Sequence, residues 1–150
     1  MLPQTVTQNL LRYLSSWSER IADDPNRDIV SISAAMDSEF LYLRMDLRGD
    51  SPDISGQHSI YEFYLLLLDL ESDHCYKIDA SKGTIERMTC DWNQILDTDK
   101  VNCIAAGGGI EVAVLLEMLG DARLIEIRAQ TRIFPDEVVD FIRGFFRISS

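Results

Sequence analysis

The stretch IYEFYLLLLDL, residues 60–70, decides how this chain folds. Its apolar residues fall on both alternating sets, so a strand here has two apolar faces instead of one. The two sets are Phe63, Leu65 and Leu67 on one side and Tyr64, Leu66 and Leu68 on the other. Such a strand has to be covered on both faces. The sequence therefore predicts an internal strand, with the N-terminal segment or a second subunit over its second face.

Strands of period two flank this stretch on both sides. Alternation of apolar and polar residues, with short turns between the runs, is typical of antiparallel strands. The runs cover residues 28–35, 40–48, 74–79, 84–90, 101–105, 110–115 and 124–132, and the polar stretch 91–100 interrupts them. We expect a mostly β protein, an antiparallel β-sandwich of jelly-roll or immunoglobulin-like type, with residues 1–150 as a single domain.

Helical periodicity is confined to short parts of the chain. Residues 5–22 carry apolar side chains at intervals of four, three and four, at Leu10, Leu14, Trp17 and Ile21. With a capping box from Thr5 to Gln8, this pattern predicts an amphipathic N-terminal helix, so that residues 1–27 pack on the sandwich as a helical segment. A strand and turn around Trp17 is the alternative. Residues 116–120 predict one helical turn, and residues 138–148 fit a helix or a closing strand equally well.

Charge and composition exclude several classes of partner. The formal net charge is −11, which repels nucleic acid and anionic membrane surfaces. The longest apolar run is too short to cross a bilayer. Neutral small molecules, saccharides, a protein partner or a second copy of the chain are the partners that remain. The three cysteines, Cys75, Cys90 and Cys103, form no paired motif, and we predict that all three are reduced.

The order of motifs along the chain resembles that of a known group of domains. The residues that carry it are Trp17, the segments 23–25, 28–32, 37–43 and 63–69, then 76–78, 107–114 and 119–120. This order is similar to the DOMON-like and family 9 carbohydrate-binding-module-like β-sandwich domains, over roughly residues 17–132. The resemblance implies a carbohydrate ligand and a secreted or cell-envelope location within a larger chain. If Met1 is the natural start, the expected location is cytoplasmic.

Exposed aromatic rings are the residues that a saccharide site requires, because a ring face buries the C–H surface of a sugar. Trp92 stands beside polar residues, and the amide of Asn93 next to it offers hydrogen bonds to hydroxyls. Tyr61 is the second aromatic candidate. We therefore predict Trp92, Asn93 and Tyr61 as ligand-binding residues.

An acidic turn follows the central strand. Asp69, Glu71 and Asp73 place carboxylates at every second residue, an arrangement suited to oxygen ligands for calcium. A structural calcium ion at this turn is one interpretation, and a solvated acidic hairpin is the other. We expect no other cofactor.

Catalytic motifs are missing from the sequence. It contains no GxSxG, HExxH or comparable nucleophile and base spacing, and the carboxylates of Glu111 and Glu126, expected on neighbouring strands, are on polar faces. The first functional hypothesis is a non-catalytic ligand-binding or accessory module. The alternatives are an interaction or structural module that oligomerises through an apolar β face, and an acidic cytosolic chaperone-like protein.

Overall fold

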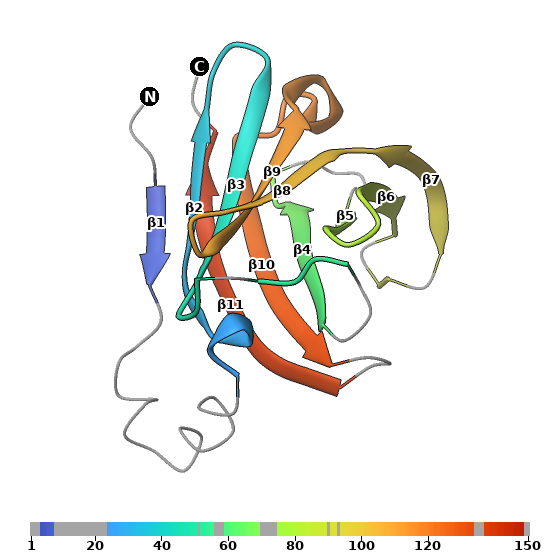
Figure 1. Ribbon diagram of the computed structural model, residues 1–150. Helices are drawn as coiled ribbons and strands as arrows, with labels where there is room; N and C mark the ends of the chain where they lie inside the picture. Colours follow the sequence, from blue (N-terminus) through green and yellow to red (C-terminus); the bar gives the residue numbers. More distant parts are fainter. Residues whose placement is uncertain are drawn as a thin grey trace.

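The computed structural model describes residues 4–7, 24–50, 52–55, 59–69, 75–89, 91–92, 94–133 and 137–148. Two antiparallel sheets face one another, which confirms the predicted mostly β, sandwich-like fold (Figure 1). The five-stranded sheet has the order β1 (Gln4–Thr7), β2 (Ile29–Met36), β3 (Phe40–Leu47), β9 (Gly109–Leu115), β8 (Asn102–Ala106). The six-stranded sheet has the order β11 (Glu137–Arg147), β10 (Leu124–Ile133), β4 (Ser59–Leu67), β5 (Cys75–Asp79), β6 (Thr84–Met88), β7 (Ile95–Lys100).

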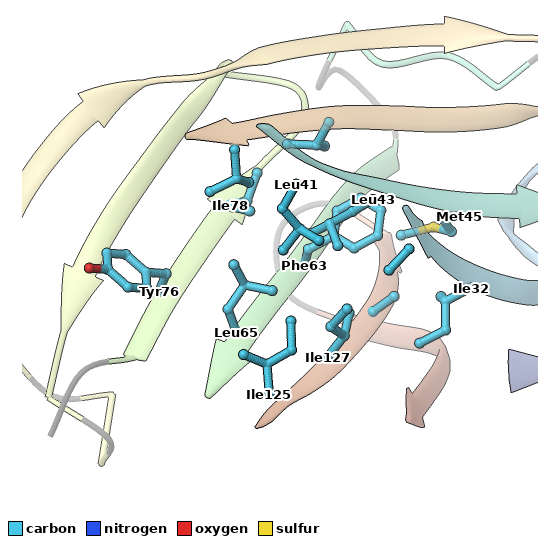
Figure 2. Packing of buried hydrophobic residues seen from close by; sticks show 14 of the residues in the cluster. Ile32, Leu41, Leu43, Met45, Phe63, Leu65, Tyr76, Ile78, Ile125 and Ile127 are labelled. Atoms are coloured by element: carbon cyan, nitrogen blue, oxygen red, sulfur yellow. The ribbon is translucent and has the colours of Figure 1, made fainter. Parts of the chain in front are cut away.

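The central strand β4 pairs with β10 on one side and β5 on the other. Its Phe63 and Leu65 are fully buried between the two sheets. Figure 2 shows apolar side chains from opposite layers converging there, including Leu43 of β3 and Ile127 of β10. The stretch 60–70 thus supplies the middle of the core.

The C-terminal segment left open by the sequence is strand β11. It pairs with β10 along its whole length, and its residues alternate between the core and the outside. Ile142 and Phe146 point inward and are buried, whereas Phe141 and Phe145 are exposed. The phenylalanines show a helix-like spacing only because Phe141 and Phe145 lie on one face of the strand and Phe146 on the other.

The helical turn predicted for residues 116–120 is present as a 3-10 helix, η3 (Leu116–Leu119), which Gly120 ends with a positive φ of 56°. A second 3-10 turn, η2 (Pro25–Arg27), precedes β2, and Asp24 caps it by accepting a hydrogen bond from the Asn26 amide.

The predicted N-terminal helix is wrong at its first residues. Thr5, Val6 and Thr7 belong to strand β1, which pairs with β2. β-branched residues favour a strand, and the helical period begins only at Leu10. Residues 8–22, which carry that period, lie outside the described part of the chain.

Strands β7 and β8 are almost one run of chain, separated only by Val101. The run begins at the edge of the six-stranded sheet and ends at the edge of the five-stranded sheet, and Figure 1 shows it passing from one layer to the other. The Val101 amide donates to the Gly83 carbonyl, 2.9 Å away. The sequence did not predict β7, because all six of its residues are exposed and no apolar set marks it.

The prediction that all cysteines are reduced is wrong for Cys75, which is disulfide-bonded. Cys103 is a free thiol, and burial raises its pKa to about 11. A lone half-buried thiol with a raised pKa is a poor nucleophile.

Candidate functional site

The predicted ligand-binding aromatics lie on opposite faces of the six-stranded sheet. Tyr61 points inward and is 0% exposed, and its hydroxyl donates to the carbonyl of Asn26 at 2.7 Å. Burial raises its pKa to about 12. Trp92 is half-buried on the outer face, and Asn93 lies outside the described residues. Tyr61 and Trp92 therefore do not form one platform.

Trp92 packs against the central strand from outside. Its ring meets that of Tyr64 edge-on, with centroids 4.9 Å apart and planes at 80°. Its backbone has a positive φ of 63°, a conformation that non-glycine residues seldom adopt. Trp92 thus covers part of the second apolar face of β4.

A charged network covers another part of that outer face. Glu62 is 0% exposed, and its carboxylate accepts hydrogen bonds from Arg132 Nε at 2.6 Å and Gln130 Nε2 at 2.8 Å. Lys77 Nζ lies 3.3 Å from the same carboxylate, and Gln130 also donates to the Tyr64 hydroxyl at 3.1 Å. A buried carboxylate is tolerated only with such partners. Side chains of the sheet itself and Trp92 therefore shield part of this face. Most of the N-terminal segment predicted to cover it lies outside the described residues, and cover by a second subunit stays a prediction.

Asp69, the one described member of the predicted calcium site, is engaged by the backbone. Its carboxylate accepts from the Arg123 amide at 2.9 Å and from the Leu124 amide at 3.4 Å. The hydrogen bond from Arg123 is the main reason that the pKa of Asp69 lies below its ordinary value. Glu71 and Asp73 lie outside the described residues, and no three potential metal ligands cluster in the part that the structure describes.

The two candidate catalytic glutamates are not neighbours. Glu111 is on β9 of the five-stranded sheet and pairs with Arg44 at 2.9 Å. Glu126 is on β10 of the other sheet and pairs with Arg128 at 2.9 Å. The expectation of neighbouring strands is wrong, because the β9 and β10 runs are consecutive in sequence but belong to different layers.

A cleft of about 270 Å³ opens on the inward side of strands β5, β6 and β7. Strand pairing aligns Tyr76, Arg87 and Asp97 in one row across these strands, because they are successive register partners. Ile78, Ile85 and Asp99 form the next row. The lining residues are Tyr76, Ile85, Arg87, Asp97, Asp99 and Met118.

The floor of the cleft is the margin of the hydrophobic core. Ile85 is 1% exposed and Tyr76 5% exposed. Figure 2 shows the Tyr76 hydroxyl pointing away from the packed cluster, and it donates to the carbonyl of Met118 in η3 at 2.7 Å. Burial raises the pKa of Tyr76, with nearby Arg87 opposing the rise and Asp97 adding to it. Tyr76 is thus a fixed neutral donor that anchors η3 over the cleft.

Arg87 supplies the polar character of the cleft. Its Nε is buried and has no hydrogen-bond partner, and no ion pair is found for its guanidinium among the described residues. A buried donor without an acceptor costs about 1–3 kcal/mol. Arg87 as a whole is half-buried and lines the cleft, so the accessible part of its side chain is the part that a ligand oxygen would meet there.

A second hollow of about 310 Å³ lies on the other side of η3. Its walls are Met36, Leu116, Leu119, Gly120, Asp121, Ala122, Arg123 and Ile148. Its two charged residues, Asp121 and Arg123, are exposed. The other lining residues carry no polar side chain that could orient a ligand. The smaller cleft is the better candidate site, because three charged side chains, Arg87, Asp97 and Asp99, line it.

Sequence reasoning missed the cleft because its polar residues meet only through strand pairing. Arg87 and Asp97 are ten positions apart, and Asp97 lies within the polar stretch 91–100 that was not recognised as containing β7. The alternation of Asp97 and Asp99 was the available signal.

No protein-family model matches the chain, and no curated protein matches it in sequence. Within the described residues, no helix has the length and apolar character needed to cross a membrane.

Proposed function

We propose that this protein is a non-catalytic binding module whose ligand is a saccharide held in the cleft between β5, β6, β7 and η3. The unpartnered Arg87 beside Asp97 in that cleft is the observation that carries the proposal. The sequence resemblance to carbohydrate-binding sandwich domains supports the ligand class.

The chemistry of a saccharide fits this arrangement. Each sugar hydroxyl both accepts and donates, so it can accept from Arg87 while donating to a neighbouring carboxylate. The apolar floor of Ile85 and Tyr76 suits the C–H face of a sugar ring. The cleft is slightly smaller than pockets for drug-sized ligands, which suits one sugar unit with the rest of the chain outside.

Arg87→Ala is expected to weaken saccharide binding about tenfold or more, because hydrogen bonds to a charged group contribute about 1.5–3 kcal/mol. Glycan-array screening identifies a binding saccharide, and titration calorimetry then measures the loss of affinity. Failure of the wild-type protein to bind any saccharide contradicts the proposed function.

Trp92→Ala is the comparison variant, since Trp92 lies on the opposite face of the sheet from the cleft. We expect it to leave saccharide affinity within about twofold. Loss of binding in Trp92→Ala with retained binding in Arg87→Ala would place the ligand on the outer face instead. Circular dichroism establishes that both variants are folded.

The outer face of β11 favours a second function, association with another copy of the chain. Phe141 is 44% exposed and Phe145 59% exposed, with Arg143 between them. A two-fold axis near Ile142 would place Phe141 of one copy beside Arg143 of the other. Such a two-fold contact would place a cation beside an aromatic ring on both sides of the interface.

This second function predicts a dimer at micromolar concentrations that Phe145→Glu converts to a monomer. A buried carboxylate without a partner would oppose the contact. Sedimentation equilibrium measures the mass, and Leu68→Glu, which also replaces an exposed apolar residue, is the control that should remain dimeric. A wild-type monomer at every concentration rules the function out.

A further inference from the structure

We infer that the cleft prefers an amino sugar over a neutral or acidic sugar, an inference that rests on the proposed saccharide-binding function. The charges of the lining residues point to this preference. Asp97 and Asp99 contribute two negative charges and Arg87 one positive charge, so the charged lining of the cleft is negative overall.

The two aspartates are accessible to a ligand. Both are exposed, and they stand at alternate positions of β7 on the side that lines the cleft. No ion pair occupies either carboxylate in the part of the chain that is described. Asp99 Oδ1 accepts a hydrogen bond from the Lys100 amide at 2.8 Å, which leaves its other oxygen for a ligand.

Arg87 selects for a second group on the same ligand. A cation alone would satisfy the aspartates but would be repelled by the guanidinium of Arg87, which lines the same cleft. A ligand with an oxygen close to its ammonium group satisfies both sides of the cleft. A 2-amino-2-deoxy sugar carries this pair of groups on adjacent carbons of one ring.

The net negative charge of the whole protein also favours a cationic ligand. The chain has a net charge of −11, so the potential outside the cleft attracts cations and repels carboxylated or sulfated sugars. The preference for an amine should therefore weaken as salt concentration rises, because exposed charges are screened.

The test compares three disaccharides that share a β-1,4 linkage: cellobiose, chitobiose and N,N′-diacetylchitobiose. Titration calorimetry at about pH 6, where an ordinary amine is protonated, should show chitobiose binding about fivefold more tightly than cellobiose. Acetylation removes the charge, and the diacetylated sugar should lose that advantage.

Variants assign the preference to the cleft. Asp97→Asn combined with Asp99→Asn should make chitobiose and cellobiose bind equally, whereas Arg87→Ala should weaken both. Glu39→Gln, which removes an exposed charge from the β2–β3 turn, should leave the preference unchanged and controls for overall charge.

Each outcome decides between the two proposals. If cellobiose binds as tightly as chitobiose, the amino-sugar preference is wrong while the saccharide-binding function stands. If the preference survives in the double aspartate variant, its assignment to this cleft is wrong. If none of the three sugars and no glycan on an array binds, the proposed function fails and the preference fails with it.

Discussion

Arg132→Met is expected to lower the free energy of unfolding by about 3 kcal/mol, because it leaves the buried Glu62 carboxylate without its closest partner. Glu62 is 0% exposed, and Arg132 reaches both of its oxygens, at 2.6 and 3.2 Å. Lys77 and Gln130 still compensate part of the charge, so the expected loss is at the lower end for a broken buried pair. Urea denaturation followed by circular dichroism measures it.

Arg143→Met is the matched control. Its side chain is 60% exposed, and its nearest carboxylate oxygen, on Glu126, is 3.7 Å away. Glu126 is buried but keeps Arg128 as a closer partner at 2.9 Å, so losing the long contact to the exposed Arg143 should cost at most about 1 kcal/mol. Equal destabilisation by Arg132→Met and Arg143→Met would show that the Glu62 network does not stabilise the fold.

The same network predicts a dependence of stability on pH. Burial by itself raises the pKa of Glu62, but hydrogen bonds from Gln130 and Arg132 and the charge of Lys77 outweigh it and lower the pKa below 4.5. A carboxyl whose pKa is lower in the folded state stabilises the protein above its unfolded pKa, and this contribution is lost as the pH falls. The wild-type protein should lose stability on acidification below pH 4.5. In Arg132→Met that part of the loss should be smaller.

Phe63→Ala is expected to cost about 4 kcal/mol of unfolding free energy, since it opens a cavity in the middle of the core. Phe63 is 0% exposed and lies on the central strand between the two layers (Figure 2). A domain of ordinary stability retains little after such a loss. Thermal unfolding followed by near-UV circular dichroism records the decrease.

Phe145→Ala makes the same chemical change on the outer face of β11. Phe145 is 59% exposed, so its truncation should change the unfolding free energy by less than about 0.5 kcal/mol in the monomer. A loss as large as that of Phe63→Ala would mean that Phe145 is covered by something in solution, as the proposed dimer requires.

The sequence was sufficient to predict the strands that bury one or both faces. The two-faced stretch around Phe63 became the central strand, because burial on both sides requires apolar residues in both alternating sets. Strand β10 likewise follows its predicted alternation. The sandwich could be predicted because its core depends on these patterns.

Features that depend on pairing between distant residues could not be predicted from the sequence. The pattern around Phe141 fits a helix and a strand alike, and only its register with β10 selects the strand. The burial of Glu62 depends on Arg132, seventy positions away, so no local signal marks it as internal. The cleft depends in the same way on the pairing of β6 with β7.

Joining the edges of both sheets through β7 and β8 has a consequence for local unfolding. The lining residues Asp97 and Asp99 lie on an exposed edge strand, which in isolation would fray at little cost. Val101 and β8 tie this edge to the opposite sheet through β9. A ligand that holds β7 in place would also slow amide hydrogen exchange in β8 and β9. Binding in the cleft would therefore be measurable in the five-stranded sheet as well.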